Sequence, residues 1–396
     1  MRILVINPGS TSTKMAVYED EKPLLLRNIT HTAEELAPFD AITEQQDFRR
    51  QLVLDELRQS DIPLEFDAVI GRGGLVKPIA GGVYEINQQM LDDTLHGCVM
   101  HNHACNLGCL IAHEIAEEIN ARPSVSGSPI QPAVSGSPIQ PAVGGSPVQS
   151  AVGGSPADTA PRCRAFIADP GVVDELSPLA RISGSPLMPR ICIWHALNQR
   201  AIARRYARGI GKEYEDLNLI ICHLGGGISI AAHEHGRAID ANNALDGEGP
   251  FSPERAGSLP AADLIRLCFS GKYNEKQLLK RIAGKAGLNA HLGTNNMREI
   301  LERIKEGDEH AKLIVEAMLY HVAKNIAAEA AVLCGNVDAI LLTGGMAHSD
   351  YIVSELRRRI GFLAPVYTFP GEDEMEALAL NALAVLQGKR EAKVYE

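Results

Sequence analysis

The chain has 396 residues, of which 45% are hydrophobic, and a formal net charge of −11. This length is sufficient for two or three domains with sizeable cores. The acidic balance argues against nucleic acid as a main partner, which would require a basic surface. No stretch approaches the roughly 18 consecutive apolar residues that a membrane helix needs, so we expect no membrane partner.

The cysteines indicate a reducing compartment. They are scattered, without a Cys-x-x-Cys pair, at positions 98, 105, 109, 163, 192, 222, 268 and 334. This spacing favours free thiols over a disulfide framework. The first apolar run ends at Asn7-Pro8-Gly9, too early for the hydrophobic region of a signal peptide. We therefore expect a cytoplasmic protein.

The N-terminal segment predicts a hairpin with a Gly/Ser turn. Residues 3–6 and 15–18 are apolar strands, and "NPGSTSTK" lies between them. The hydroxyl cluster and Lys14 are typical of a phosphate site, but the segment is not a P-loop. No glycine precedes Lys14, and no helix follows to direct its N–H groups at a phosphate.

The later elements alternate between strands and helices. We expect helices at 46–59 (with Phe48, Leu52 and Leu57 broadly on one face), 106–119, about 310–333 and about 376–387. Strands followed by glycine turns are expected at 66–75, 218–227 and 338–345. Strands mixed with helices of ten residues or more place the protein in the α/β class.

Two segments half a chain apart are alike. "ILVINPGSTSTKMAV" and "LIICHLGGGISIAAH" both predict a strand, a Gly/Ser turn and a second strand. This similarity suggests two related halves that each begin with the same hairpin. A third glycine turn, Thr343-Gly344-Gly345, supports this interpretation.

Residues 126–161 contain four copies of a nine-residue unit rich in Pro, Gly and Ser. Calcium-binding nonapeptide repeats need a repeated Asp, and only Asp158 occurs here. Such a composition cannot build a core, so we expect a solvated surface insertion without a part in chemistry.

Three glycine turns of this kind are typical of the actin-like, ribonuclease H-like ATPase fold. Within it the chain resembles the acetate and butyrate kinases of the acetokinase family, and the butyrate branch most closely. The resemblance rests on the blocks "VINPGSTSTK", "GRGG", "ADPGVVDEL", "HALNQRAIARRYA", "CHLGGGIS", "DANNALDGEGPFSPERAGSLP", "HLGTNNMREI" and "LLTGGMAHS". It implies two similar domains, residues 1–187 plus 376–396 and residues 188–375, with the active site in the cleft between them.

The resemblance also implies an activity. The expected reaction is reversible transfer of the ATP γ-phosphoryl group to butyrate, which gives butyryl phosphate and ADP with Mg²⁺. Branched-chain fatty acids, propionate or acetate are alternative substrates. An alternative of another class is an actin-like, ATP-dependent binding module without acyl phosphate chemistry. A homo-oligomer, dimeric or larger, is expected.

The chemistry requires fixed positive charge more than a base. A carboxylate is already ionised at pH 7, and the difficulty is the approach of two anions. Arginine suits this role because it is always charged and grips oxyanions in bidentate fashion. By resemblance, the catalytic residues are Arg72, Asp169, His195 and Arg255.

The resemblance assigns the remaining site residues. Asn7 and Glu374 would hold the metal, although Glu372 and Asp373 adjoin Glu374. Nucleotide and phosphate contacts fall on Asn7, Ser10, Ser12, Lys14, His223, Gly225, Gly226, Gly227, Asn296, Arg298, Gly344 and Gly345. The substrate pocket would include Gly73, Gly74, His103 and Trp194, with the two glycines making room for a longer acyl chain.

The segment 98–113 is dense in cysteine and histidine, which raises the question of a zinc site. Cys105, Cys109 and His113 recur every four residues, as on one helix face. The spacing matches no standard structural zinc pattern. We therefore do not expect zinc.

Overall fold

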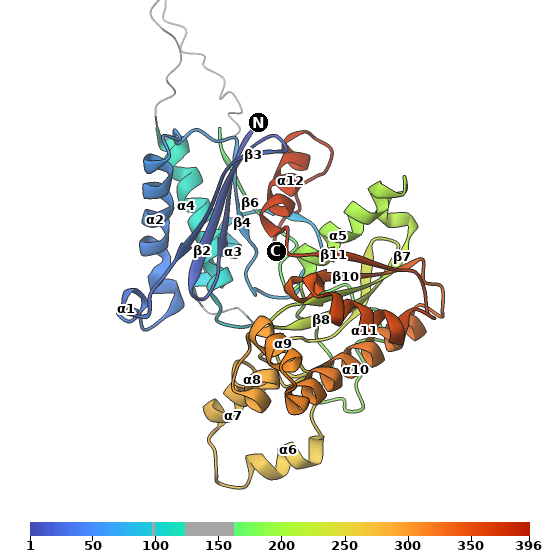
Figure 1. Cartoon of the computed structure of the whole chain (residues 1–396). Helices are drawn as coiled ribbons and strands as arrows, with labels where there is room; N and C mark the ends of the chain where they lie inside the picture. Colours follow the sequence, from blue (N-terminus) through green and yellow to red (C-terminus); the bar gives the residue numbers. More distant parts are fainter. Residues whose placement is uncertain (97–99, 123–161) are drawn as a thin grey trace, which may run out of the picture.

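The computed structural model describes residues 1–96, 100–122 and 162–396. The nine-residue repeat lies outside them. The described chain forms two lobes, each built around one β-sheet (Figure 1). None of the helices in these described ranges is long and apolar enough to span a membrane.

The first sheet has six strands in the order β3-β2-β1-β4-β6-β5. The strands are β1 (Arg2–Pro8), β2 (Ser12–Glu19), β3 (Lys22–Thr30), β4 (Ala68–Arg72), β5 (Val83–Glu85) and β6 (Arg164–Ala168). β1, β2 and β3 form an antiparallel meander, and β4 runs parallel to β1. The predicted N-terminal hairpin is therefore confirmed.

The second sheet repeats the same plan in the order β11-β10-β7-β8-β9. Its strands are β7 (Asn218–Leu224), β8 (Ile228–Glu234), β9 (Arg237–Ala241), β10 (Ala339–Gly344) and β11 (Val366–Pro370). β7, β8 and β9 form the meander, and β10 is parallel to β7. Five strands thus have equivalent places in the two sheets, and β5 of the first sheet has no counterpart in the second. This correspondence confirms the α/β class and the two similar halves.

Both faces of each sheet are covered by helices. The helices of the first lobe are α1 (Ala33–Leu36), which has no buried residue, α2 (Gln46–Gln59), α3 (Gln88–Leu95), α4 (Leu107–Ala121) and, from the end of the chain, α12 (Glu374–Leu386). Along β1, Leu4 and Ile6 contact the core under α2 and α4, whereas Ile3 and Val5 contact the core under α12. Burial of both faces explains why β1 is a continuous apolar run.

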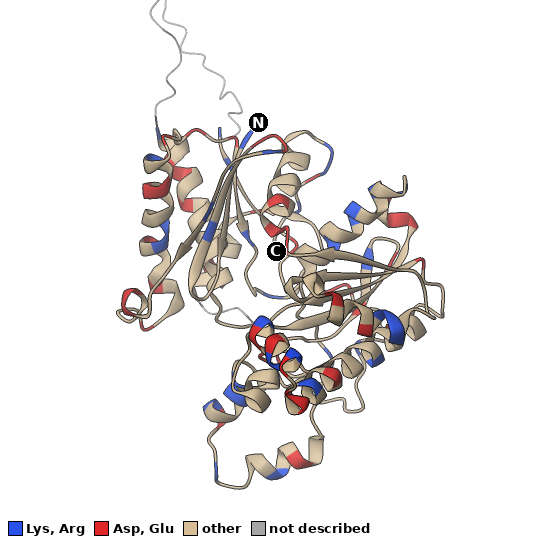
Figure 2. Cartoon of the chain, in the orientation of Figure 1, with Lys and Arg blue, Asp and Glu red and all other residues tan. Residues whose placement is uncertain are grey.

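The second lobe contains α5 (Ala196–Gly209), α6 (Ala261–Cys268), α7 (Glu275–Ile282), α8 (Gly287–Leu292), α9 (Met297–Lys305), α10 (Glu309–Val332) and α11 (Asp350–Ile360). α10 and α11 cover one face of the sheet, and α5 covers the other. Helices α6 to α9 form the outer end of this lobe (Figure 1). Lys, Arg, Asp and Glu residues are concentrated on the helices and are sparse along the strands (Figure 2).

The inner helices of the two lobes, α5 and α12, pack against each other. α12 also packs on β1, β4 and β6, so the last helix returns to the first lobe as expected. The domain boundaries 1–187 plus 376–396 and 188–375 are compatible with this arrangement and stay a prediction.

Helix α2 has the predicted bounds but a different buried face. Leu57 is buried as expected, whereas Phe48 and Leu52 are only half-buried. The buried positions include Arg49, whose side chain is 0% exposed. A face that buries an arginine was not foreseen, because hydrophobic periodicity ignores charged side chains.

Candidate active site

The turn of the first hairpin joins β1 to β2. Gly9 N donates to Ser12 O at 2.7 Å, which closes the turn. Ser10 and Lys14 are exposed and Ser12 is half-buried. The three predicted phosphate-binding side chains therefore lie on one short, accessible segment.

A buried arginine holds this turn from behind. Arg49 Nη1 donates to Gly9 O at 2.8 Å and to Ser12 O at 3.0 Å, and Nη2 donates to Ser10 O at 3.3 Å. Gln45 Oε1 accepts from Arg49 Nε and Nη2. Because the carbonyls of the turn point at Arg49, they are withdrawn from the side on which a phosphate would bind. The sequence analysis missed this residue.

The turn of the second hairpin is built from glycine. Gly225 N donates to Gly227 O at 3.1 Å, and Ser252 donates to Gly226 O at 2.7 Å. At the end of β7, His223 Nδ1 lies 2.9 Å from Asn198 Oδ1 of α5. The predicted residues of the second phosphate turn therefore lie together.

Arg255 crosses the backbone of this second turn. A Cβ atom on Gly227 would overlap the Arg255 guanidinium, so only glycine permits the approach. Nη1 of Arg255 donates to Ala244 O at 2.8 Å. Burial lowers the pKa of Arg255, but an arginine guanidinium stays protonated in proteins. Its charge is thus held in place by backbone packing.

Arg72 is the last residue of β4 and contacts Glu374, one of the two predicted metal ligands. Its Nη1 donates to Glu374 Oε2 at 3.0 Å, and Asn7 Nδ2 donates to the same oxygen at 2.7 Å. Glu374 is 5% exposed and begins α12. Burial is the largest single effect and opposes the charge of Arg72, but Glu374, Cys105 and Glu372 together outweigh it and raise the pKa of Arg72.

The two acidic residues that precede Glu374 contact different partners. Glu372 Oε1 lies 3.0 Å from His223 Nε2, and this contact lowers the pKa of Glu372 to about 2. Asp373 instead pairs with Arg205 at 2.8 Å. Glu372 and Glu374 therefore link the two hairpins, one through His223 and the other through Asn7, whereas Asp373 faces elsewhere.

His195 precedes α5 and stacks on His223 with ring centroids 3.8 Å apart. Its Nδ1 lies 2.8 Å from Ser229 Oγ, which already accepts from His195 N and from Gln199 Nε2. The serine hydrogen therefore donates to Nδ1, and Nε2 carries the imidazole proton. Burial, His223 and Arg255 lower the pKa of His195 well below its usual value. His195 is a neutral donor at pH 7.

A cavity of about 90 Å³ collects the predicted catalytic and substrate residues. Its lining includes Arg72, Gly73, His103, Trp194, His195 and Arg255, together with Leu75, Ile193 and Leu245. His103 Nδ1 accepts from Cys105 N at 3.2 Å, and burial, Arg72 and Arg255 lower the pKa of His103 to about 4. The cavity thus combines two cations, two neutral imidazoles and an apolar wall.

Of the predicted catalytic and substrate-pocket residues, Asp169 and Gly74 lie outside this cavity. Asp169 is 1% exposed; Oδ1 accepts from Gly82 N at 2.8 Å and lies 3.1 Å from Arg200 Nε, and Oδ2 lies 3.6 Å from Arg204 Nη1. Its charge is therefore matched by arginines of α5 rather than by Arg72 or Arg255. Gly74 is also absent from the lining.

The two glycines after Arg72 serve the packing of the backbone. A Cβ on Gly73 would lie 2.5 Å from Pro170 Cβ, and one on Gly74 would lie 2.8 Å from Asn106 Cα. A larger residue at either position would move these neighbours. Pocket width alone does not explain this pair of glycines.

The last four predicted nucleotide-binding residues form two groups. Gly344 has φ +90° and lies against Leu224, beside the second phosphate turn, and Gly345 begins η4 (Gly345–His348). Asn296 Oδ1 caps α9 by accepting from Arg298 N at 3.2 Å. The exposed side chain of Arg298 has no hydrogen bond among the described contacts.

The described residues hold no group of three or more His, Cys, Asp or Glu side chains that could bind a metal. Cys98 lies outside the described ranges. Asn7 and Glu374, with Glu372 nearby, offer oxygen ligands only. Few protein oxygens, completed by water and phosphate, fit Mg²⁺.

The acetokinase family model matches residues 191–364. A probable butyrate kinase of Bacteroides thetaiotaomicron is 58% identical over 396 residues and is covered, like this chain, over 100% of its length. Butyrate kinase 1 of Clostridium acetobutylicum is 45% identical over 396 residues, which cover 100% of this chain and 99% of that protein. The chain belongs to the acetokinase family.

Solved structures agree with this acetokinase assignment at the level of the fold. The crystal structure of Porphyromonas gingivalis acetate kinase superimposes with a TM-score of 0.71 at 19% identity, over 97% of this chain and 99% of that chain. A propionate kinase from Francisella tularensis gives 0.68 at 16% identity, over 96% and 98% of the two chains. The predicted fold is confirmed.

Proposed function

We propose that this acetokinase phosphorylates a short-chain carboxylate, with butyrate as the preferred substrate and ATP as the donor. The products are butyryl phosphate and ADP. The single observation that carries the proposal is the cavity in which Arg72, His195 and Arg255 converge. Full-length relatives named butyrate kinase support the choice of substrate.

The chemistry follows from the charges. Arg72 and Arg255 enter the cavity from different lobes, so a carboxylate and a phosphoryl group between them would be attracted rather than repelled. His195, neutral and protonated at Nε2, would donate to an equatorial oxygen of the phosphoryl group. No general base is needed, because the attacking carboxylate is already ionised.

Nucleotide and metal would lie next to this cavity. Asn7 and Glu374 would hold Mg²⁺, which neutralises charge on the β- and γ-phosphates when it is bound. Glu374 would then exchange its contact with Arg72 for the metal, which frees the guanidinium for substrate. Ser10, Ser12 and Lys14 would contact phosphate from one lobe and Gly225 to Gly227 from the other.

Discrimination among acyl chains would be modest. The apolar part of the cavity is formed by Leu75, Ile193, Trp194 and Leu245. Each buried methylene is worth about 0.8 kcal/mol, so propionate and branched acids are the expected secondary substrates.

A hydroxamate assay tests the function. ATP, Mg²⁺, butyrate and hydroxylamine should give butyryl hydroxamate, with acetate giving a lower kcat/KM. ATP hydrolysis without hydroxamate from any short carboxylate would overturn the proposal and favour the ATP-dependent binding module.

A further inference from the structure

A second cavity, of about 250 Å³, lies between the later parts of α5 and α12. It shares no lining residue with the candidate active-site cavity. Four cations line it: Arg204, Arg208, Lys212 and Arg390. We propose that this cavity binds a small phosphate-bearing anion, which acts on His195 through a chain of hydrogen bonds.

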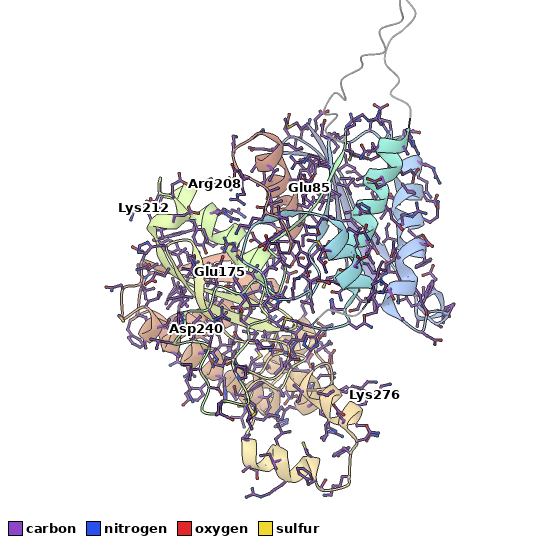
Figure 3. The ribbon with its side chains drawn as sticks, turned by 180° about the vertical axis from the view of Figure 1, so that it is seen from behind. Glu85, Glu175, Arg208, Lys212, Asp240 and Lys276 are labelled. Carbon is purple, nitrogen blue, oxygen red and sulfur yellow. The ribbon has the colours of Figure 1, made fainter. Side chains whose placement is uncertain are left out.

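The lining of this second cavity contains more cationic than acidic side chains. The lining contains two carboxylates, Glu213 and Glu215, against the four cations, of which Arg204 also lies 3.6 Å from the buried Asp169. The chain as a whole has a net charge of −11. Arg208 and Lys212 are exposed at the end of α5 (Figure 3). Within the described part of the chain, neither forms an ion pair within 4.0 Å. These two charges are free to meet an external anion.

Arg390 provides a second, more buried wall. Its Nη1 donates to Asn381 Oδ1 of α12 at 2.6 Å, which fixes the guanidinium beside the cavity. Burial, and then the neighbouring Arg204, lower the pKa of Arg390. A bound anion would relieve this repulsion between cations.

The residue types favour phosphate. Three of the four cations are arginines, whose planar donors match phosphate oxygens in bidentate geometry. The remaining wall carries small apolar side chains, among them Ala201, Ala377 and Leu380, that could contact an organic group. The expected ligand is therefore a phosphorylated small molecule rather than a macromolecule.

A directed chain of hydrogen bonds runs from the cavity to the active site. Tyr214, which lines the cavity, donates to His233 Nδ1 at 2.6 Å. His233 Nε2 then donates to Gln199 Oε1 at 3.0 Å, and Gln199 Nε2 donates to Ser229 Oγ at 2.9 Å. Ser229 donates to His195 Nδ1 at 2.8 Å. Each member has one donor for the next, so the chain determines the tautomer of His195.

The two helices provide a mechanical link as well. α5 follows His195 and its later part lines the cavity, while α12 begins at Glu374 and its later part forms the opposite wall. An anion that draws these walls together would move both active-site residues. Binding and catalysis are thereby coupled.

Calorimetry with pyrophosphate tests the binding site. The full chain is titrated with Mg²⁺, butyrate and a saturating non-hydrolysable ATP analogue present, so that the candidate active site is filled. The double variant Arg208→Ser/Lys212→Ser should bind pyrophosphate at least about tenfold more weakly than the wild type. Lys276→Ser removes an exposed cation from α7 (Figure 3) and should bind like the wild type. Absence of wild-type binding, or equal binding by the double variant, would overturn the site.

The effect on His195 rests on the proposed function and is measured separately. At saturating ATP and butyrate, pyrophosphate should change the hydroxamate rate of the wild type. It should not change the rate of the double variant, nor that of Tyr214→Phe, which still binds but lacks the first donor. A wild-type rate that pyrophosphate leaves unchanged would overturn the coupling. A protein that binds pyrophosphate but forms no hydroxamate would contradict the proposed function and leave the anion site intact.

Discussion

The turns of the two hairpins occupy equivalent positions in the two lobes but are held in different ways. The first turn is supported by the buried guanidinium of Arg49, which donates to three of its carbonyls. The second is a run of three glycines with Arg255 lying across it. One fold therefore tolerates two solutions, because under the proposed function each turn needs only to direct backbone N–H groups at a phosphate.

The two lobes also each contribute one arginine to the cavity. Replacement of Arg72 or Arg255 by Ala should lower kcat by about 10²–10³, the scale of losing one preorganised donor in the transition state. Steady-state hydroxamate kinetics measure the effect, and Arg266→Ala on the exposed α6 serves as the control. A variant that keeps more than half of the wild-type rate would remove that arginine from the mechanism.

The geometry of the second turn can be disrupted by a substitution that leaves all charged residues in place. Gly227→Ala should displace the Arg255 guanidinium and lower kcat by about 10–100-fold, less than removal of the arginine. The matched control is Gly184→Ala, since a Cβ there would meet nothing within 4 Å. Wild-type kinetics for Gly227→Ala would contradict the close approach.

Loss of the support of Arg49 for the first turn should affect KM for ATP more than kcat. Arg49→Met leaves the carbonyls of the turn and Gln45 Oε1 without donors, which should cost about 2–4 kcal/mol of unfolding free energy. We expect KM for ATP to rise about tenfold with a smaller fall in kcat. Arg50→Met, one position along α2 and half-buried, is the control. An unchanged KM would mean that the turn keeps its shape without Arg49.

The smallest expected effect concerns how the free energy of unfolding depends on pH. The pKa of His103 is about 4 and that of His233 about 3, both lowered mainly by burial, whereas unfolded histidine titrates near 6.5. Both groups are thus neutral when folded, and their contribution to stability is complete above about pH 6.5 and is lost as the pH falls toward 4. Urea denaturation at pH 7.5, 6 and 5 should show falling stability. His103→Gln should flatten that slope, and a parallel slope would contradict the shift.

The local patterns of the sequence determined the elements of both lobes. Apolar runs and glycine turns predicted β1, β2, β4, β7 and β10, because strands buried on both faces leave a strong hydrophobic signal. Helical periodicity predicted α2, α4, α10 and α12. Resemblance in short blocks was sufficient for the family, and six of the residues that it assigned line the cavity: Arg72, Gly73, His103, Trp194, His195 and Arg255.

Only the tertiary structure shows which charged side chains, far apart in the sequence, pair with one another. It paired Asp169 with Arg200 and Arg204 of α5, whereas the resemblance named Asp169 as catalytic without giving its partners. It also revealed the role of Arg49, whose backbone partners in the first turn lie 37 to 40 positions away. Such contacts leave no periodic trace in the sequence, because a buried ion pair or donor depends on the packing of elements that are far apart in the chain.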